Sequence, residues 1–391
     1  MSERLVVEAL WTGAELLRRA ALLRSSAGVI TAIGAAAPEE AALPGLVCAG
    51  FVNAHTHLEL SHLRGRVPGG AGSVAWVRGL FAENGPRQAG ASALRAALVE
   101  ARAAGTVALL DVSNGGHTGA AIAEASLQGV VLAECIGLSP ERFAPALEAA
   151  ALPTGWPSGV LRRPTAHSPV SCSPALLEVA LRAAEGGPWP TIHCDEDPDD
   201  RLLLADRQGA WVGLHAALGN PLEALGRAPS GLRLLGALGL LGPRLGLVHL
   251  VAADDEDIAL LAASGATAVL CPRSNLHIGG RLPPVAALVA AGVPLAIGTD
   301  SLASAPDLDL LAEAAALAAA APGVDPRRWL EALTEGGARL LGPVAPAGLR
   351  VGARPALLHL ALPPGANPLA ALFDGTRWPR RWLSPPAWSA P

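Results

Sequence analysis

The sequence contains no lysine and no tyrosine, so all 29 of its basic side chains are arginine. The absence of lysine excludes mechanisms that rest on a lysine Schiff base or on the lysine of a phosphate-binding loop. It also excludes a carboxylated lysine that bridges two metal ions. Any metal chemistry in this chain must therefore use other ligands.

Cysteine is scarce and scattered. The chain has five cysteines, an odd number, and none of them shows Cys-x-x-Cys spacing. This argues against a disulfide scaffold and against a thiolate zinc site, and it favours a reducing compartment. The five are Cys48, Cys135, Cys172, Cys194 and Cys271.

Basic clusters, a signal peptide and a membrane-spanning run are also missing. The formal net charge is −5, and no basic cluster is interleaved with aromatic residues, so we expect neither nucleic acid nor an anionic membrane surface as a partner. The first residues lack the apolar core of a signal peptide. The most apolar stretch, Leu310–Ala321, contains Glu313 and is too short to cross a bilayer. We expect a soluble cytoplasmic protein; its oligomeric state stays open, a homo-oligomer included.

The order of segments predicts an α/β fold. Strand-like runs alternate with helix-like stretches such as Ala91–Ala104, Pro174–Ala184 and Asp257–Ala263. Eight strands alternating with helices over roughly 250–300 residues is the scale of a (β/α)8 TIM-like barrel, which we place at residues 46–346. The strand candidates are Leu46–Ala54, Thr106–Asp111, Gly129–Cys135, Leu161–Ala166, Pro190–His193, Leu245–His249, Ala266–Cys271 and Pro294–Gly298.

The two flanks of the predicted barrel differ from it in composition. Residues 1–45 carry short strand-like runs, and residues 347–391 are rich in Pro, Gly and Trp, with one strand-like segment at Ala356–Leu362. Neither flank is large enough to form a domain alone. We expect the two to pair into a small β-sandwich on one side of the barrel.

Two further segments receive a structural interpretation. The acidic run Asp254–Asp257 predicts a helix N-terminus, where carboxylates cap free N–H groups and offset the dipole. The run Gly69–Gly72 does not follow a strand as a phosphate loop would. We interpret it as part of a loop over the barrel mouth, from which Trp76 and Phe81 either close on a bound base or anchor the loop.

The most informative stretch is Gly50–Glu59, in which His55 and His57 follow an apolar run. Alternate side chains of a strand point the same way, so both imidazoles emerge together at the strand's end. Two neutral imidazoles aimed at one point are half of a divalent-metal site. A single His-x-His pair is equally well explained as the cap of a strand.

Three later strands also end in a polar side chain. His193 ends the fifth strand, His249 the sixth and Asp300 the eighth. Catalytic residues of such barrels lie at the C-terminal ends of the strands. Each residue alone is compatible with a cap or a turn, but three in order after a His-x-His predict one site.

These motifs resemble the amidohydrolase superfamily, and in particular its cytosine deaminase/chlorohydrolase-like branch. The resemblance covers nearly the whole chain. Within that branch, His55–Ser61, Ala166–Pro169 and Cys271–Asn275 most resemble aminodeoxyfutalosine deaminases of the futalosine route to menaquinone. The residues that carry the resemblance are Ala49–His57, His193-x-x-Glu196, Val248-His249, Cys271–Asn275 and Gly298–Ser301.

The resemblance implies that His55, His57, His193 and Asp300 are metal ligands. Three imidazoles and a carboxylate with one exchangeable position suit Zn²⁺, and Fe²⁺ accepts the same ligands. With no lysine to bridge a second ion, we expect one metal.

The implied reaction is hydrolytic deamination, in which a metal-activated water attacks the amine-bearing ring carbon. Asp300 accepts the water proton, Glu196 protonates the ring nitrogen and then the leaving ammonia, and His249 stabilises the developing oxyanion. Asp195, an acid beside Glu196 where the branch often has alanine, raises the pKa of Glu196 if it points inward.

Four residues are candidate substrate contacts, each with a structural alternative. Glu59 is placed to accept hydrogen bonds from ribose hydroxyls, or it is a solvated loop carboxylate. His167 ends the fourth strand and reaches the nucleoside, or it belongs to a turn. Arg273 and Asn275 follow the seventh strand; the arginine pairs with a substrate carboxylate or forms a structural ion pair.

The leading hypothesis is an aminohydrolase that converts 6-amino-6-deoxyfutalosine to futalosine and ammonia. Deamination of another purine nucleoside, S-adenosylhomocysteine, guanine or cytosine uses the same site, as does dechlorination of a triazine-like ring. A barrel that has lost activity and acts as a binding module is the alternative of another class. Ala305, where the branch commonly has asparagine, leaves the substrate open.

Overall fold

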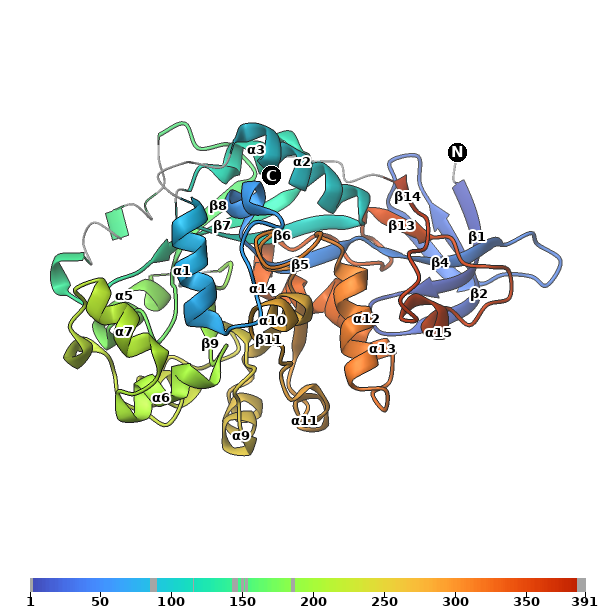
Figure 1. Ribbon diagram of the computed structural model, residues 1–391. Coiled ribbons are helices and arrows are strands. Elements are labelled where there is room, and N and C mark those ends of the chain that lie inside the picture. The colour runs from blue at the N-terminus through green and yellow to red at the C-terminus, as the bar shows by residue number, and fades with distance from the viewer. Residues whose placement is uncertain are drawn as a thin grey trace.

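The structure, a computed structural model, describes residues 3–84, 90–114, 116–142, 147–148, 151, 154–183 and 187–384. Its strands form three sheets (Figure 1): two four-stranded parallel sheets, ordered β5-β6-β7-β8 and β9-β10-β11-β12, and one six-stranded sheet, ordered β14-β13-β4-β1-β2-β3. The strands of the parallel sheets are β5 (Phe51–Thr56), β6 (Thr106–Ser113), β7 (Gln128–Cys135), β8 (Val160–Ala166), β9 (Thr191–Cys194), β10 (Gly246–His249), β11 (Thr267–Leu270) and β12 (Leu295–Ile297).

The two parallel sheets meet at their outer strands. Between β12 and β5, the backbone amides of Thr299 and Asp300 both donate to the carbonyl oxygen of His55, at 3.0 and 3.1 Å. Between β8 and β9, the amide of His193 donates to the carbonyl of His167 at 3.0 Å. The regular ladders stop at β8 and β12, so these contacts join the sheets at the carboxyl ends of their strands.

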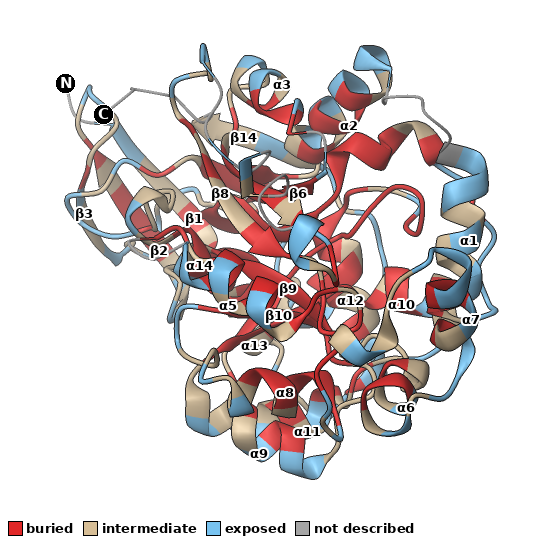
Figure 2. Cartoon of the chain, turned by 90° about the vertical axis from the view of Figure 1, so that its left-hand side faces the viewer, coloured by how far each residue is buried: buried red, intermediate tan, exposed pale blue. Residues whose placement is uncertain are grey.

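The parallel strands are the core of the molecule. Every residue of β6, β10 and β11 is buried, as expected of strands that are covered on both faces. Figure 2 shows the buried residues concentrated on these strands and the exposed ones on the surrounding helices. On α2, for example, Leu94 and Leu98 pack against Leu109 of β6 while the opposite side of the helix faces solvent.

The helices lie on the outside of the strands (Figure 1). In the part of the chain that the structure describes, no helix combines the length and hydrophobicity needed to cross a membrane. The helices are α1 (Ser73–Asn84), α2 (Ala91–Ala103), α3 (Thr118–Glu124), α5 (Pro174–Arg182), α6 (Pro198–Asp206), α7 (Ala210–Ala217), α8 (Gly231–Ala237), α9 (Asp255–Ser264), α10 (Pro272–Gly279), α11 (Val285–Ala290), α12 (Leu310–Ala320), α13 (Arg327–Glu331), α14 (Gly337–Leu341) and α15 (Pro368–Leu372).

Helix α9 begins as predicted from its acidic run. The side chain of Asp254 accepts a hydrogen bond from the amide of Asp257, and the side chain of Asp257 accepts one from the amide of Asp254. This reciprocal capping satisfies amides that the helix itself leaves unpaired. The interpretation of Asp254–Asp257 as a helix N-terminus is confirmed.

The predicted strand Leu46–Ala54 is in fact two strands in two different sheets. Its first part belongs to β4 (Leu43–Ala49) of the six-stranded sheet, its second part to β5, and Gly50 separates them. A Cβ atom at Gly50 would lie 2.7 Å from the Cβ of Val107. The chain can therefore change sheets here only with a residue that lacks a side chain. The other predicted barrel strands correspond to β6–β12.

The two flanks form one six-stranded sheet rather than a sandwich of two sheets. On β4, Leu46 and Cys48 pack into the main core, whereas Val47 and Ala49 pack into a separate cluster on the other face. Because the rest of the protein covers one face of the sheet, no second sheet is needed to bury it. The flanking strands are β1 (Glu3–Trp11), β2 (Leu16–Arg24), β3 (Ile30–Ala35), β4, β13 (Leu357–Leu360) and β14 (Arg380–Ser384).

Trp11 ties the six-stranded sheet to the rest of the core. It ends β1, it is almost fully buried, and its indole N–H donates to the Thr334 hydroxyl at 3.1 Å. We expect Trp11→Ala to lower the free energy of unfolding by about 3–5 kcal/mol, because it removes a large buried side chain and leaves a cavity. Urea denaturation measures this change. The exposed Phe81→Ala is the control, and a loss as small for Trp11 as for Phe81 would disprove this role.

Candidate active site and metal centre

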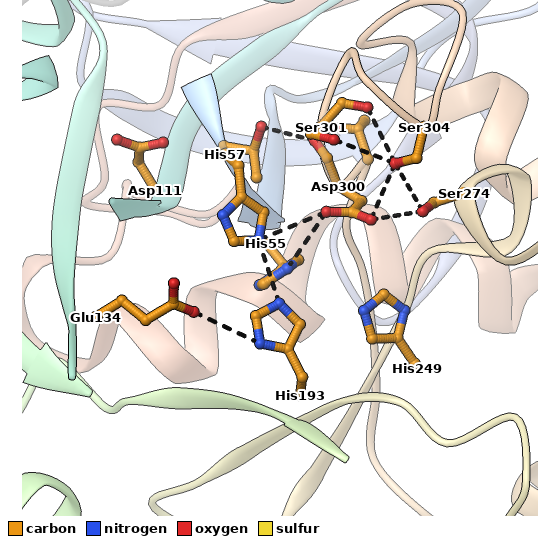
Figure 3. Close-up of polar contacts among 12 residues, drawn as sticks. His55, His57, Asp111, Glu134, His193, His249, Ser274, Asp300, Ser301 and Ser304 are labelled. Carbon is orange, nitrogen blue, oxygen red and sulfur yellow. Dashed lines mark hydrogen bonds and ion pairs between the residues drawn. The ribbon is translucent and has the colours of Figure 1, made fainter. Parts of the chain in front are cut away.

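The strands place five polar side chains around one point. His55 is on β5 and His57 directly follows it, His193 is on β9, His249 ends β10 and Asp300 follows β12. Figure 3 shows these side chains converging from different strands. His249 and Asp300 have φ angles of +76° and +55°, a conformation that costs free energy for residues other than glycine and that clusters at functional sites.

The candidate ligand atoms are spaced as the ligands of a metal ion are. The Nε2 atoms of His57 and His193 are 3.2 Å apart. The Oδ1 atom of Asp300 lies 3.6 Å from Nε2 of His57 and 3.7 Å from Nε2 of His55. Ligands about 2.0–2.1 Å from a tetrahedral Zn²⁺ are separated by roughly 3.3 Å. The three distances therefore match those between ligands that share one ion.

The protonation of the imidazoles also fits a metal. Nδ1 of His193 lies 2.8 Å from the carbonyl oxygen of His167, so it donates its proton there and Nε2 keeps a lone pair toward the site. Neither ring nitrogen of the buried His55 has a hydrogen-bond partner. Burial lowers the pKa of His193 to about 3 and that of His55 well below its usual range. Neutral imidazoles with free lone pairs are what a cation needs.

Asp300 is held by hydroxyl groups on one side only. Its Oδ2 accepts hydrogen bonds from Ser274 and, at 3.1 Å, from Ser304. This leaves Oδ1 turned toward His55 and His57 (Figure 3). The two serines thus orient the carboxylate, as the surroundings of a metal ligand generally do.

Glu196 and His249 stand beside this cluster. Oε1 of Glu196 lies 3.5 Å from Nε2 of His249. Nδ1 of His249 accepts a hydrogen bond of 2.9 Å from the side-chain amide of Asn275, so the proton of a neutral His249 is on Nε2, facing the site. Burial, and then the charges of Asp300 and Asp197, raises the pKa of Glu196 to about 8. Glu196 is therefore a carboxylic acid, able to donate a proton, at neutral pH.

The expected influence of Asp195 on Glu196 is not seen. The carboxylate of Asp195 accepts hydrogen bonds from the amides of Gly231 and Leu232 at the start of α8. It therefore points toward a helix N-terminus and away from Glu196. Asp197, further along the chain, supplies the like charge instead.

A cavity of about 350 Å³ opens onto the cluster. Two of the four predicted substrate contacts, Glu59 and His167, line it together with His57, His193, Glu196, His249 and Asp300. Among its other lining residues, apolar side chains come mainly from α1 and α7: Trp76, Val77, Leu80, Phe81, Trp211, Leu214 and Leu218. No arginine occurs among the described residues that line it.

Of the two roles left open for Arg273, the contacts favour the structural ion pair. Its guanidinium binds Glu313 at 2.6 Å and Asp307 at 2.7 Å, and it does not line the cavity. Glu313 is fully buried, and an unpaired buried carboxylate is costly. The need to pair the Glu313 carboxylate explains why Arg273 points into the protein.

Asn275 also differs from its predicted role. It does not line the cavity, and its amide instead donates to His249. It acts on the site through that histidine.

The loop Gly69–Gly72 lies beside α10, the helix that contains Asn275. The amides of Gly70 and Gly72 donate to the backbone carbonyls of His277 and Ile278 in that helix. Trp76 and Phe81, which follow it, do line the cavity.

Several site residues were missed from the sequence. Glu134, at the end of β7, lines the cavity close to His193 and His167. It is a polar residue at the end of an apolar strand, the same signal that marked His193. Asn114 and Asp200, by contrast, lie in a loop and in helix α6, where polar residues are common and carry no such signal.

Comparison with known proteins shows a family. The match to the amidohydrolase family covers residues 46–379, which confirms the resemblance found in the sequence. The aminodeoxyfutalosine deaminase of Deinococcus radiodurans is 35% identical over 184 residues, 45% of this chain and 44% of that protein. The chain thus spans less than half the length of this curated relative. The 5-methylthioadenosine/S-adenosylhomocysteine deaminase of Halobacterium salinarum is 31% identical over 82% of this chain and 75% of its own length.

Solved structures share the fold. Aminofutalosine deaminase of Helicobacter pylori, in complex with methylthio-coformycin, has a TM-score of 0.80 at 18% identity. The match covers 95% of each chain. An adenosine deaminase from Xanthomonas campestris with bound zinc has a TM-score of 0.73 at 26% identity over 95% of this chain and 88% of its own.

The site predicts one metal ion per chain. We expect elemental analysis of the purified protein to find about one equivalent of zinc or iron. The variants His193→Ala and Asp300→Ala should lose most of it, because each removes one ligand of the cluster, whereas His62→Ala should keep it. Ser274→Ala should weaken metal binding by roughly 10- to 100-fold, because Asp300 loses its orientation. Full metal content in a His57→Ala/His193→Ala double variant would refute the assignment.

Proposed function

This chain belongs to the amidohydrolase family, and on that premise we propose that it is a metal-dependent deaminase of purine nucleosides. The observation that carries the proposal is that Glu196 and His249 lie beside Asp300, which itself lies beside His55 and His57, at a cavity that Glu196 lines; the pKa of Glu196 is raised to about 8. A cation site next to an acid of raised pKa is what hydrolysis of a C–N bond requires. The deaminases among its relatives support the same reaction class.

His55, His57, His193 and Asp300 would hold the metal. A bound divalent cation supplies a water molecule that is ionised near neutral pH. The donor set suits Zn²⁺, and the zinc in the Xanthomonas campestris structure supports this choice; Fe²⁺ accepts the same donors. The absence of lysine in this chain favours one ion over a lysine-bridged pair.

The side chains around the metal would move the protons. Asp300 accepts a proton from the attacking water through Oδ1. Glu196 donates its proton to the ring nitrogen beside the amine-bearing carbon, which makes that carbon electrophilic. The proton that Asp300 took from the water then passes to the departing ammonia through Glu196, and the hydroxyl proton released as the carbonyl forms restores the acid form of Glu196. His249, with its proton on Nε2, donates a hydrogen bond to the oxyanion that develops on the substrate. One water and one amine thus yield a carbonyl and ammonia.

The substrate we propose is 6-amino-6-deoxyfutalosine, which would give futalosine for menaquinone synthesis. The Deinococcus radiodurans relative and the Helicobacter pylori fold neighbour support it. The apolar wall of α1 and α7 would pack against the base and the aromatic ring of this substrate. 5-Methylthioadenosine and S-adenosylhomocysteine are the competing substrates, since the relative from Halobacterium salinarum matches over much more of the chain.

We further propose that the two parallel sheets work as one closed (β/α)8 barrel, with the flanks as a separate small domain. The backbone contacts at both seams support closure, and so does the fold shared with other amidohydrolase structures. Closure matters for function because it brings β5 beside β12, and with them His55 beside Asp300.

The substrate proposal predicts the outcome of a comparison among amines. Zinc-loaded protein should release ammonia from aminodeoxyfutalosine with a kcat/KM at least about 100-fold above that for any competitor, roughly 2.7 kcal/mol of discrimination. The competitors are 5-methylthioadenosine, S-adenosylhomocysteine, adenosine, guanine and cytosine, and His193→Ala is the control for contaminating activity. Preference for another nucleoside would keep the reaction and change the substrate; no release from any compound would reject the deaminase.

The role of Glu196 predicts a pH dependence. Since its pKa is raised to about 8, the proton that it donates is present below that pH and lost above it, so kcat/KM should fall as the pH rises through this range. Glu196→Gln should lower kcat by about 10²- to 10⁴-fold and abolish the alkaline fall. Asp197→Asn, which removes a like charge, should move the fall to lower pH. An unchanged alkaline limb in Glu196→Gln would assign the titration to another group.

A further inference from the structure

Two carboxylates line the cavity beside the metal cluster and share one amide. Glu59 lies in the 3-10 helix η1 (Leu58–Leu63) that follows β5, and Glu134 lies at the end of β7. The side-chain amide of Asn114 donates to Oε1 of Glu59 at 3.2 Å and to Oε2 of Glu134 at 2.9 Å. The Ser113 hydroxyl and the backbone amide of Asn114 donate to Glu59 as well, at 2.7 and 2.8 Å. Both carboxylates are therefore held in fixed positions.

The second oxygen of Glu134 has no hydrogen-bond partner. Its side chain is only 2% exposed, and Oε1 finds no donor in the described part of the chain. Oε1 lies 3.7 Å from Nδ1 of His193, which already donates to the carbonyl of His167, and 4.0 Å from Nε2 of His167. Both distances exceed a hydrogen bond. Figure 3 shows Glu134 directed toward His193, at the metal end of the cavity.

A buried carboxylate in this position needs a hydrogen-bond donor. An ionised carboxylate accepts hydrogen bonds and donates none, and leaving one unpaired in a buried wall is costly. The described lining of the cavity contains no arginine that might neutralise it, and the chain has no lysine. A bound ligand can supply the partner, as hydroxyl or amine hydrogens and not as an anion.

We propose, resting on the nucleoside deaminase function above, that Glu59, Glu134 and Asn114 form a diol clamp for the 2′- and 3′-hydroxyls of a ribose. In this clamp Oε1 of Glu134 accepts the proton of one hydroxyl, and the carboxylate of Glu59, held by Ser113 and Asn114, accepts the other. The amide of Asn114 sets the separation of the two carboxylates. The two negative charges exclude nucleotides, so the substrates are nucleosides with an intact diol.

The clamp is tested by removing one hydroxyl at a time. Rates of deamination are compared for adenosine, 2′-deoxyadenosine and 3′-deoxyadenosine, and calorimetric titration measures the affinity for inosine, 2′-deoxyinosine and 3′-deoxyinosine, which do not react. For the wild-type protein, we expect removal of the hydroxyl that donates to Glu134 to lower the deamination rate and the affinity by about 10- to 100-fold. This is the effect of losing a hydrogen bond to a charged group. Glu134→Ala should no longer distinguish that deoxynucleoside from its parent, and Glu134→Gln should fall in between.

Controls separate this clamp from a general effect of mutation. Glu256→Gln, on the exposed side of α9, should keep the wild-type preference. Suppose that inosine binds more tightly than its deoxy analogues only when Glu134 is present, and that adenosine is not deaminated. This result would support the clamp and reject the deaminase function. Deamination with equal rates for ribo- and deoxynucleosides would sustain the deaminase and overturn the clamp. A preference that survives Glu134→Ala, or the absence of inosine binding, would also overturn it.

Discussion

The carbonyl oxygen of His55 is the point on which the site depends. It accepts hydrogen bonds from the amides of both Thr299 and Asp300, and the side chain of Asn53 bonds Thr299 through its amide and its oxygen. These contacts join the first and last strands of the parallel sheets where the chain supplies a histidine and a carboxylate to one centre. The backbone thus sets the distance between the two ligands before any metal binds, which lowers the cost of assembling the site.

The electrostatics of the cavity follow from the same arrangement. Carboxylates of Glu59, Glu134, Glu196 and Asp300 line a space in which the basic groups are imidazoles. Burial raises the pKa of Glu134 and Glu196 and lowers that of His193, whereas the pKa of Asp300 stays below its ordinary value and its charge raises that of His57 against the effect of burial. A divalent cation would balance the charge of the ionised Asp300 carboxylate, which gives a second physical reason, besides the ligand geometry, for a metal at this point.

The sequence predicted the parts of the molecule that obey strand periodicity. Strands β6–β12, with His193 on β9 and His249 at the end of β10, could be found because a buried parallel strand is an apolar run with a sharp end. Gly50 could not be recognised as a change of sheet, because apolar residues continue on both sides of it. For Arg273 the sequence left a substrate carboxylate and a structural ion pair as alternatives, and it did not indicate the contact of Asn275 with His249. Arg273 contacts Glu313 and Asn275 contacts His249. Both partners lie far away in the sequence, so the residues around 273–275 do not reveal them.

Because β4 runs directly into β5, the flanking sheet cannot be treated as an independent module. β4 lies between β13 and β1 in the six-stranded sheet, and after Gly50 the same segment becomes the strand that carries His55. The flank's strand therefore continues, without an intervening linker, into the strand of His55, the first proposed metal ligand. In evolution as in engineering, such a flank is not exchanged as a cassette; it changes together with the catalytic strand that it leads into.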